Sequence, residues 1–516
     1  MLSLPVTASG GAGQSVTYQF SGLDRRARIA DGAARDMENI APDGLPCLTV
    51  RPPRGKLRGL ENPTLLVYKN GKEILVDGTK LLIDGEAKAD VAAGRKTWAV
   101  IGSRVCIWPD KLCVDTADGT VRPLGVQQEA AKATFTNSTL TLDSDSIFKK
   151  GDGVTISGCK ETYNNRTVVV QEVEGKTLTV YDNVFQHGEL GSEQPDDWTE
   201  TDITLERVVP ALDFVCEKDN RLWGTHDNAV CCCKLGDPYN WNVFNGLSTD
   251  AWETEVGSDG VFTGIAAFSS HVIAFKEHMA HKIYGQKPTA FQVQPAHIEG
   301  VKAGCEQSIV NLNETIFYLS PSGVMAYAGG IPDCVSPQLT DAYSEAAAGR
   351  LAQKYYLSAR KSDGAYELLV LDTDTGVWVR EDATEARAFA VRDGALCWIT
   401  PDALWCSAGN TETLVPWRVT LGPFERVTAA RQTVSRLHVL MDLPAGSRAL
   451  AEIRFDDGPW LPRRRMTGTG ERTFRVPFVP RRCGTFSVRL SGYGPMTLHA
   501  VTRGTREGSD QLWRSM

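Results

Sequence analysis

Residues 214–233 read Phe-Val-Cys-Glu-Lys, Asp-Asn, Arg-Leu-Trp-Gly-Thr, His-Asp-Asn and Ala-Val-Cys-Cys-Cys, three apolar runs separated by two polar turns. The same arrangement returns three more times before residue 382, in units that begin near Ile265, Ser308 and Lys354. Short runs rich in Val, Ile, Phe, Tyr and Trp, broken by Asp-Gly, Ser-Gly or Asp-Asn, are typical of β-strands joined by hairpin turns. The stretch therefore predicts a series of small antiparallel sheets.

Three more units follow this template, at residues 65–83, 98–114 and 388–406, which makes seven candidates. Successive units start roughly 30 to 55 residues apart once an insertion is set aside, a period that suits one small sheet per unit. Such a sheet cannot bury both of its faces alone, and a closed ring protects strand edges better than an open row. We predict an all-β protein with a β-propeller of about six or seven blades; a linear β-array is the alternative.

Between the second and third units the pattern changes. Residues 133–206 carry shorter alternating strands with turns such as Lys150-Gly-Asp-Gly and Asn164-Asn165, which predicts a small β-barrel inserted into the propeller. The acidic residues 189–200 are expected to form an exposed loop. The insertion could meet a partner or could be a solvated domain without one.

The ends of the chain differ from its middle. Residues 1–20 predict an extended arm or a strand that pairs elsewhere, and residues 33–39 allow at most one or two helical turns. After residue 409 longer alternating strands indicate a β-sandwich. We expect an N-terminal arm that leads into the propeller (1–60), the first part of the propeller (61–130), the inserted small β-barrel (131–207), the remainder of the propeller (208–412), a C-terminal Arg-rich β-sandwich (413–506) and a tail (507–516).

Charge is distributed unevenly. Residues 415–516 hold 17 Arg, no Lys and 8 acidic residues, a formal charge of +9, whereas the rest holds 38 basic and 55 acidic residues, a formal charge of −17. Two basic clusters between the predicted sandwich strands are candidate interface residues: Arg463, Arg464, Arg465, Arg481 and Arg482. Arginine favours defined bidentate contacts, so these clusters could dock acidic protein or DNA phosphate, or could be solvated loops.

Composition and cysteine use indicate a globular protein made in a reducing cytoplasm. Hydrophobic residues make up 42% and charged residues 23% of the chain. No run is long enough for a membrane span, and the N-terminus lacks the basic leader and apolar core of a secretory signal. The 13 Cys include no CxxC pair, and consecutive Cys231 to Cys233 would alternate faces in a strand. We expect buried structural thiols rather than a metal site.

Several phrases, taken in their order along the chain, give a resemblance. They are Gly22-Leu-Asp-Arg, Gly32-Ala-Ala-Arg-Asp-Met-Glu-Asn-Ile, Leu45-Pro-Cys-Leu-Thr-Val-Arg-Pro, Asn220-Arg-Leu-Trp-Gly-Thr, Leu235-Gly-Asp-Pro-Tyr-Asn-Trp-Asn-Val-Phe, and residues 315–330 and 481–494. Together these resemble tailed-phage β-propeller structural proteins, the tail-nozzle or head-closure stabilisation family of short-tailed phages and prophages. The resemblance implies a ring of identical subunits in the virion tail, a channel for genome passage, and no catalysis.

Motifs for catalysis or cofactors are not found. The chain has no Walker-type phosphate loop, no GxSxG and no HExxH. His278 and His281 fall in a turn and a strand, and Asp372-Thr-Asp-Thr-Gly is interpreted as a blade hairpin rather than a calcium loop or a sialidase Asp-box. The aromatic residues of the blades are expected to be packing residues: Trp223, Tyr239, Trp241, Phe317, Tyr318 and Trp378. We predict no catalytic, cofactor-binding or metal-binding residues and no cofactor.

The predicted function is therefore a non-enzymatic structural component of a phage or prophage tail or head–tail junction. It would form a homo-oligomeric ring, contact a tail adaptor or neighbouring tail proteins, and let double-stranded DNA pass without sequence-specific binding. Acidic residues could line such a channel because like charge avoids binding phosphate. The predicted location is the virion tail, after synthesis in the bacterial host cytoplasm. The alternative is a carbohydrate-binding or glycoside-cleaving β-propeller that recognises a host surface.

Overall fold

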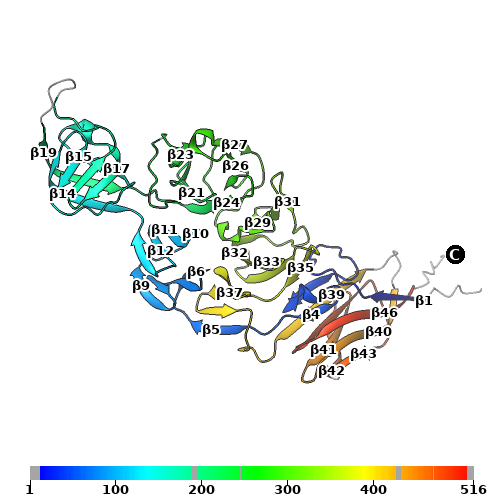
Figure 1. Cartoon of the computed structure of the whole chain (residues 1–516). Coiled ribbons are helices and arrows are strands. Elements are labelled where there is room, and N and C mark those ends of the chain that lie inside the picture. Colours follow the sequence, from blue (N-terminus) through cyan, green and yellow to red (C-terminus); the bar gives the residue numbers. More distant parts are fainter. Residues whose placement is uncertain (1–11, 189–195, 245, 426–431, 469, 508–516) are drawn as a thin grey trace, which may run out of the picture. The chain divides into compact units, whose positions relative to one another are not determined.

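The structure is a computed structural model that describes residues 12–188, 196–244, 246–425, 432–468 and 470–507 (Figure 1). Within these residues the elements are strands and four short 3-10 helices, with no α-helix. The predicted fold class is confirmed: the protein is an all-β β-propeller protein with an inserted barrel and a C-terminal β-sandwich. The chain divides into two compact units, Val67–Glu306 and the pair Met1–Leu66 with Gln307–Met516, called here the middle unit and the terminal unit.

The middle unit carries four-stranded antiparallel sheets whose strands follow sequence order, the build of propeller blades. Their strands are β6 (Pro63–Lys69, which begins in the terminal unit), β7 (Lys72–Asp77), β8 (Lys80–Ile83) and β9 (Glu86–Asp90); β10 (Thr97–Ile101), β11 (Arg104–Trp108), β12 (Leu112–Asp115) and β13 (Thr120–Pro123); β20 (Phe214–Lys218), β21 (Arg221–His226), β22 (Ala229–Cys232) and β23 (Trp252–Glu255); β24 (Gly264–Ala267), β25 (Val272–Lys276), β26 (Met279–Tyr284) and β27 (Gln292–Ala296). Short 3-10 helices η3 (Pro288–Ala290) and η4 (Glu306–Ser308) lie near its end. The hairpin β6–β7 turns at Asn70 and Gly71, both with positive φ (52° and 75°), as a two-residue type I′ turn requires.

The inserted strands form a closed barrel in the order β14-β15-β18-β17-β16-β19. The barrel comprises β14 (Val126–Phe135), β15 (Thr139–Leu142), β16 (Gly153–Ser157), the 3-10 helix η2 (Thr162–Asn164), β17 (Thr167–Glu174), β18 (Thr177–Val180) and β19 (Trp198–Arg207). Its core centres on Phe135, which meets the ring of Phe185 edge-on at 5.0 Å and stacks on Trp198 at 5.8 Å. Closure leaves no free strand edge, so a domain of this size can bury an apolar core of its own.

The acidic loop expected at residues 189–200 needs correction. Residues 189–195 lie outside the described part of the chain. Glu200 lies in β19, and it is buried rather than exposed. Its carboxylate accepts hydrogen bonds from the backbone N–H groups of Lys160 (2.9 Å) and Glu161 (3.4 Å), which satisfies a charge that would otherwise be costly to bury.

The terminal unit carries three further four-stranded sheets. Two follow sequence order: β28 (Val310–Leu312), β29 (Thr315–Ser320), β30 (Gly323–Tyr327) and β31 (Asp333–Cys334); β32 (Tyr343–Leu351), β33 (Lys354–Lys361), β34 (Tyr366–Asp372) and β35 (Val377–Arg380). The third joins β36 (Ala388–Arg392), β37 (Ala395–Thr400) and β38 (Ala403–Cys406) to β5 (Gly55–Gly59) from the N-terminal part of the chain. Gly59 lies opposite Ala403 and Gly55 opposite Cys406, so two distant segments complete one sheet.

The sandwich is also built from both ends of the chain. One sheet has the path β3-β4-β46-β40-β43, with β1 on β46 and β44 on β40; the other has the order β2-β39-β45-β41-β42 (Figure 1). The elements are β1 (Ala12–Thr17), β2 (Ala34–Glu38), β3 (Ile40–Ala41), the 3-10 helix η1 (Pro42–Gly44), β4 (Leu48–Val50), β39 (Pro416–Glu425), β40 (Gln432–Leu443), β41 (Arg448–Phe455), β42 (Leu461–Thr467), β43 (Gly470–Arg475), β44 (Arg481–Cys483), β45 (Thr485–Tyr493) and β46 (Thr497–Glu507). Residues 12–17 thus form a strand that pairs elsewhere, as predicted.

The helical turns allowed for residues 33–39 are wrong, because Ala34–Glu38 is strand β2. A β-bulge interrupts its pairing with β39 between Ala34 and Asp36. The bulge turns both Ala34 and Met37 inward although they are three residues apart. In the sequence that spacing resembles the period of a helix.

Candidate functional site

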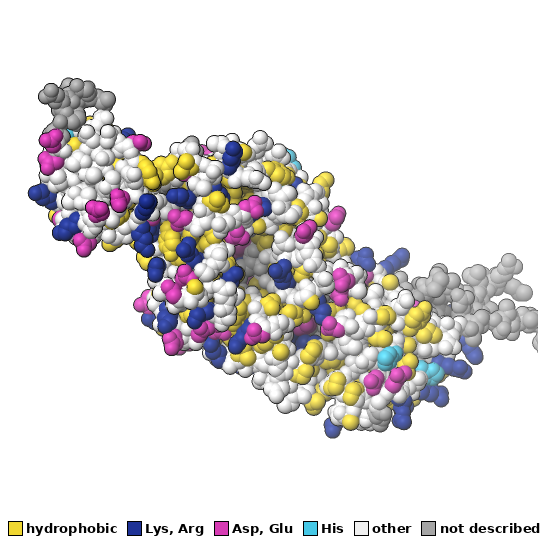
Figure 2. Space-filling model, viewed as in Figure 1, with side chains coloured by type: hydrophobic (Ala, Val, Ile, Leu, Met, Phe, Trp, Pro, Cys, Tyr) yellow, Lys and Arg dark blue, Asp and Glu magenta, His cyan; other side chains and the backbone are white. Residues whose placement is uncertain are grey.

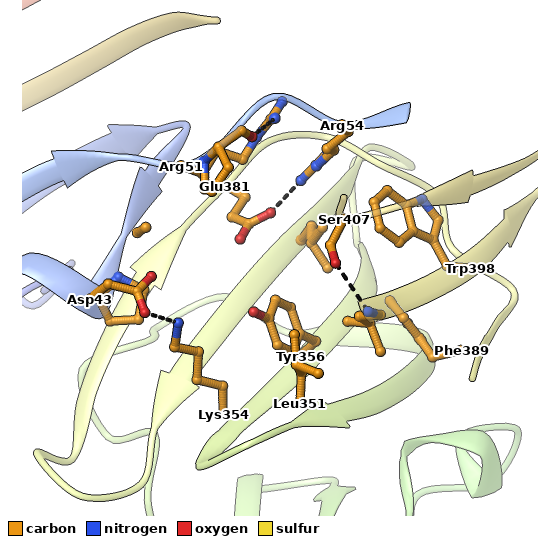
Figure 3. A pocket seen from close by; sticks show the side chains of 15 residues that line it. Asp43, Arg51, Arg54, Leu351, Lys354, Tyr356, Glu381, Phe389, Trp398 and Ser407 are labelled. Carbon is orange, nitrogen blue, oxygen red and sulfur yellow. Dashed lines mark hydrogen bonds and ion pairs between the residues drawn. The ribbon is translucent and has the colours of Figure 1, made fainter. Parts of the chain in front are cut away.

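A pocket in the terminal unit is the candidate site (Figure 3). Its volume is about 290 Å³, and it is called here the ligand pocket. Its walls come from the N-terminal segment, the sheet β32–β35 with the residues after β35, and the sheet β36–β38 with the residue after β38. The lining residues are Ala41, Pro42, Asp43, Arg51, Pro52, Arg54, Leu351, Lys354, Tyr356, Leu368, Glu381, Phe389, Leu396, Trp398 and Ser407.

Strand periodicity brings the aromatic and basic side chains into the pocket. Lys354 and Tyr356 are two residues apart in β33, so both point to the same face of the sheet. Trp398 of β37 lies opposite Phe389 of β36 in the strand register, with ring centroids 6.5 Å apart. The indole Nε1 of Trp398 is buried and finds no acceptor among the described residues. A ligand oxygen at this wall could therefore accept a hydrogen bond from it.

Arg54 is the most constrained cation of the pocket. It precedes β5, is 5% exposed, and its guanidinium spans two adjacent carboxylates, Glu381 and Asp382 (2.5 Å). Its Cζ also lies 5.1 Å from the ring centroid of Trp398. Burial would lower the pKa of Arg54, but the two carboxylates raise it, so the charge is retained. For the acid the signs are reversed: burial raises the pKa of Asp382, but the charge of Arg54 lowers it, and the pKa lies below its usual value.

Arg51 forms a second paired site beside the first. Its guanidinium contacts the carboxylate of Glu412 through two hydrogen bonds of 2.6 and 2.9 Å, and its Nε donates to the side-chain oxygen of Asn39 at 2.7 Å. The amide of Asn39 in turn donates to the carbonyl of Pro416, at the start of β39. These bonds connect the N-terminal segment to β39, the first sandwich strand after the propeller sheets, so Arg51 and Arg54 hold the walls of the pocket in place.

The accessible polar groups of the pocket lie at Lys354 and Asp43, which form an ion pair (Figure 3). The side chain of Asp43 is 61% exposed and that of Lys354 is 18% exposed. Tyr356 lies nearby; burial, together with the charges of Glu381 and Asp43, raises its pKa, so its hydroxyl remains a neutral donor. The pocket thus offers aromatic surface beside hydrogen-bonding groups, and each of its cations is paired with a carboxylate.

Sequence reasoning proposed no residue of the ligand pocket as a site residue. Arg54 and Glu381 are 327 positions apart, and no local motif connects them. The available signal was weak: two arginines within Arg51-Pro-Pro-Arg54, next to strands that the template did not include. Their role becomes visible only when β5 pairs with β38.

The predicted interface arginines lie in strands, not in loops between strands, which corrects their expected placement. Arg463, Arg464 and Arg465 lie in β42, and Arg481 and Arg482 in β44, and all five are exposed. Within the described residues β42 pairs only with β41, and β44 only with β40, so both are edge strands. Figure 2 shows Lys and Arg side chains gathered over the sandwich sheets.

Contacts of these arginines are with the sandwich itself. Arg464 donates to the carbonyl of Arg475 in β43 at 2.9 Å, and its Cζ lies 5.8 Å from the ring centroid of Phe474. The Cζ of Arg481 lies 5.5 Å from the ring centroid of Phe455. Flat arginines on aromatic rings keep their remaining N–H donors available at the surface.

The other candidates behave as local structure. Asp372 caps the β34–β35 turn, where its carboxylate accepts from the backbone N–H groups of Asp374 and Thr375, so the hairpin interpretation is confirmed. His281 is buried, and its Nε2 lies 2.7 Å from the hydroxyl of Ser258. The blade aromatics are buried packing residues as predicted, with Tyr239 partly buried: Trp223, Trp241, Phe317, Tyr318 and Trp378.

All 13 cysteines are free thiols, and ten are buried, as predicted. Burial raises the pKa of Cys159 to about 11 and that of Cys232 to about 12. No helix in the described residues is long and apolar enough to cross a membrane.

Comparison with known proteins gives no family. No protein-family model matches the chain, and no curated protein matches it. Similar solved structures include an exo-β-1,3-galactanase from Phanerochaete chrysosporium, at 10% identity over 56% of this chain and 94% of that chain, with a TM-score of 0.24. The phage phi92 endosialidase shares 11% identity over 73% of this chain and 70% of that chain, with a TM-score of 0.26. A Trypanosoma rangeli sialidase shares 9% identity over 96% of both chains, with a TM-score of 0.27.

These likenesses correct one expectation. The three structures are glycosidases by name, so the prediction that this chain is not an enzyme is contradicted and is withdrawn. With TM-scores of 0.24 to 0.27, none of them identifies a ligand or a reaction for this chain.

Proposed function

We propose that the protein binds a carbohydrate in the ligand pocket. The observation that carries the proposal is that Trp398 and Tyr356 line the same cavity as the Lys354–Asp43 ion pair. A sugar ring has apolar C–H faces that suit an aromatic wall and hydroxyl groups that need donors and acceptors at defined places. A volume of about 290 Å³ is at the lower end for small-molecule sites, which favours one or two sugar units.

The charge balance of the pocket favours a neutral sugar. Arg54 is neutralised by Glu381 and Asp382, Arg51 by Glu412, and Lys354 by Asp43. A phosphate or a carboxylated sugar would need a cation that is free to pair with it. Such a ligand would have to break an existing ion pair, whereas a neutral sugar can accept hydrogen bonds without separating the charges.

The test is ligand-observed NMR of the full-length protein with a panel of neutral and sialylated oligosaccharides. Lys354→Met and Asp43→Asn each remove one polar group of the pocket while keeping most of the side-chain volume. Lys80→Met is the matched control, because Lys80 pairs with Asp90 on the surface of the middle unit.

We expect a neutral oligosaccharide to bind, and each pocket variant to weaken binding by about tenfold, the value of roughly one hydrogen bond to a charged group. The control should bind as the unmodified protein does. The proposal fails if no neutral sugar binds, or if Lys80→Met weakens binding as much as Lys354→Met. Release of new reducing ends in the same samples would extend the proposal from binding to cleavage.

We also propose, as a second function, that the arginine edge of the sandwich docks an acidic protein surface during assembly of a phage tail. The arginine edge is the set Arg463, Arg464, Arg465, Arg481 and Arg482 on β42 and β44. Charged side chains on an edge strand block the addition of another strand. A partner would therefore dock on these arginines through side-chain contacts rather than through backbone pairing. Their partner would be a tail adaptor or a neighbouring copy in a homo-oligomeric ring of the virion tail, with DNA passing through.

Light scattering at low and high salt, with negative-stain imaging, tests this second proposal. We expect closed rings, alone or with tail-adaptor protein, that dissociate as salt screens the arginines. Replacement of Arg463, Arg464 and Arg465 by Gln should prevent assembly, while Arg122→Gln on exposed β13 should not. The proposal is contradicted if the protein stays monomeric at both salt concentrations and does not bind tail proteins. It is also contradicted if the triple variant assembles as well as the unmodified protein.

A further inference from the structure

Three potential metal ligands meet on one face of the sheet β20–β23 in the middle unit. His226 ends β21, Cys231 lies in β22 and Glu253 lies in β23. Cys231 lies opposite Glu253 where β22 pairs with β23, and opposite Gly224 where β22 pairs with β21. Opposed residues share a face, and Gly224 and His226 are two apart in β21, so all three donors point to the same side.

The sequence could not show this meeting. Because consecutive residues of a strand alternate faces, the run Cys231 to Cys233 suggested that these thiols do not share a metal. In the structure Cys232 faces away from the three donors and packs among Trp223 and Val230. Cys233 faces the same way as Cys231, but its sulfur accepts a hydrogen bond from the backbone N–H of Leu222 at 3.1 Å. The remaining donors come from neighbouring strands.

The distance between the donor atoms of His226 and Glu253 fits a shared ion better than a hydrogen bond, whereas the thiol of Cys231 also donates to the carbonyl oxygen of Gly224 at 3.7 Å. The donor atoms of His226, Cys231 and Glu253 all lie within 4.8 Å of one another. Nε2 of His226 is 3.6 Å from Oε2 of Glu253, which is too long for a hydrogen bond. Two ligands that each lie about 2.0–2.2 Å from a zinc ion in tetrahedral geometry are separated by roughly 3.3–3.6 Å.

The environment of His226 supports the same interpretation. Its Nε2 is buried and has no hydrogen-bond partner among the described residues, although the ring is 22% exposed. Nδ1 lies 3.6 Å from the carboxylate of Asp227, on the side away from Nε2. At 3.6 Å, and with its side chain 98% exposed, this carboxylate makes no hydrogen bond to the ring, so Nε2 is the ring atom that identifies His226 as a possible ligand.

We propose that His226 Nε2, Cys231 Sγ and a carboxylate oxygen of Glu253 form a site for Zn²⁺. A thiolate, an imidazole and a carboxylate are the donor types that zinc accepts, and the soft sulfur disfavours Mg²⁺ and Ca²⁺. The thiol of Cys231 loses its proton to solvent as the S–Zn bond forms. Because Glu253 is 43% exposed, the fourth coordination position opens to water.

The experiment is a titration of the metal-free full-length protein with Co²⁺, followed by competition with Zn²⁺. Cobalt bound to a thiolate gives a sulfur-to-metal charge-transfer band and the visible bands of tetrahedral Co²⁺. We expect one Co²⁺ per chain with both signals, displaced by one Zn²⁺, and a higher Tm with Zn²⁺ bound.

Matched variants assign the signal to this site. Cys231→Ser should abolish the charge-transfer band, whereas Cys232→Ser, equally buried on the opposite face, should keep it. Glu253→Gln is partly exposed and should fold even if Cys231→Ser does not, and it should lower cobalt affinity at least tenfold. The proposal is overturned if the unmodified protein binds no Co²⁺ through sulfur, or if Glu253→Gln and Cys231→Ser bind it unchanged through other thiols.

Discussion

Replacement of Arg54 by Met would remove the cation that two neighbouring carboxylates share in the terminal unit. Met keeps much of the side-chain volume but has no charge and no N–H donor. Glu381, 7% exposed, and Asp382 would then lose their shared partner. We expect the variant to fold with a less stable terminal unit.

The size of the stability loss depends on how far Glu381 and Asp382 are shielded from water. Breaking a buried ion pair by removing one partner costs about 3–5 kcal/mol, because the other charge stays buried. The side chain of Asp382 is 22% exposed, which places the loss at the low end, about 3 kcal/mol. This equals roughly a 150-fold change in the folding equilibrium constant.

The loss of unfolding free energy in Arg54→Met should depend on pH, and the direction of this dependence follows from the pKa of Asp382. Arg54 holds the pKa of Asp382 below its usual value in the folded protein, despite burial. That carboxylate therefore stabilises the folded state above its unfolded pKa, about 3.9, and the contribution is lost as pH falls through the folded pKa. In Arg54→Met the pKa of Asp382 rises, so the difference in unfolding free energy between the two proteins should narrow from pH 7 to pH 4.

Pulsed hydrogen–deuterium exchange along a urea series measures this unit separately, on peptides that cover β5, β35 and β38. The control is Lys80→Met, whose partner Asp90 is mostly exposed and whose loss should leave the midpoint nearly unchanged. The reasoning is refuted if Arg54→Met shifts these peptides no more than the control does. It is also refuted if the loss is the same at pH 4 as at pH 7.

Three further predictions test the packing. Gly22→Ala should cost about 2 kcal/mol or more in urea unfolding, because φ is +80° and a Cβ would lie 2.3 Å from a backbone carbonyl oxygen; Gly71→Ala, with φ of +75° and nothing within 4 Å, should cost less. Burial lowers the pKa of His271 to about 4, so it should stay neutral in NMR titration to that pH, and stability should fall as pH drops from about 6.5 to 4, an effect that His271→Gln reduces. Native thiol labelling should modify Cys334 first and Cys47 more slowly, since Cys334 is exposed and Cys47 half-buried, and Cys334→Ser should remove the fast phase.

Hairpins could be predicted from the sequence because their turns restrict the backbone locally. Asp393-Gly394 joins β36 to β37 with both residues at positive φ, 48° and 77°. Few residue pairs adopt this geometry, so the turn and the strands beside it can be read from a short segment. The same reasoning explains why three strands of each unit could be identified from its apolar runs and turns, whereas the position of a fourth strand could not.

Long-range pairing could not be predicted in the same way. β5 has the residues of an exposed linker, Gly-Lys-Leu-Arg-Gly, and it becomes a strand because β38 offers an unpaired edge more than 340 residues later. Residues 33–39, for which at most one or two helical turns were allowed, contain strand β2, whose bulge produces a spacing of three between inward residues. The metal ligands His226, Cys231 and Glu253 lie on three strands, so their meeting depends on register, which no single segment specifies.

The segment from β2 to β5 links the stability of the terminal unit to the ligand pocket. It supplies strands to both sandwich sheets, the arginines that hold the pocket walls, and the strand that completes the sheet β36–β38. A ligand that binds only the folded pocket must therefore stabilise all of these pairings by mass action, about 2.7 kcal/mol at a hundred times its Kd. For the same reason a variant such as Arg54→Met loses the pocket together with the fold around it. Lys354 and Asp43 are the better positions for testing function, because their ion pair lies at the accessible side and no strand pairing depends on it.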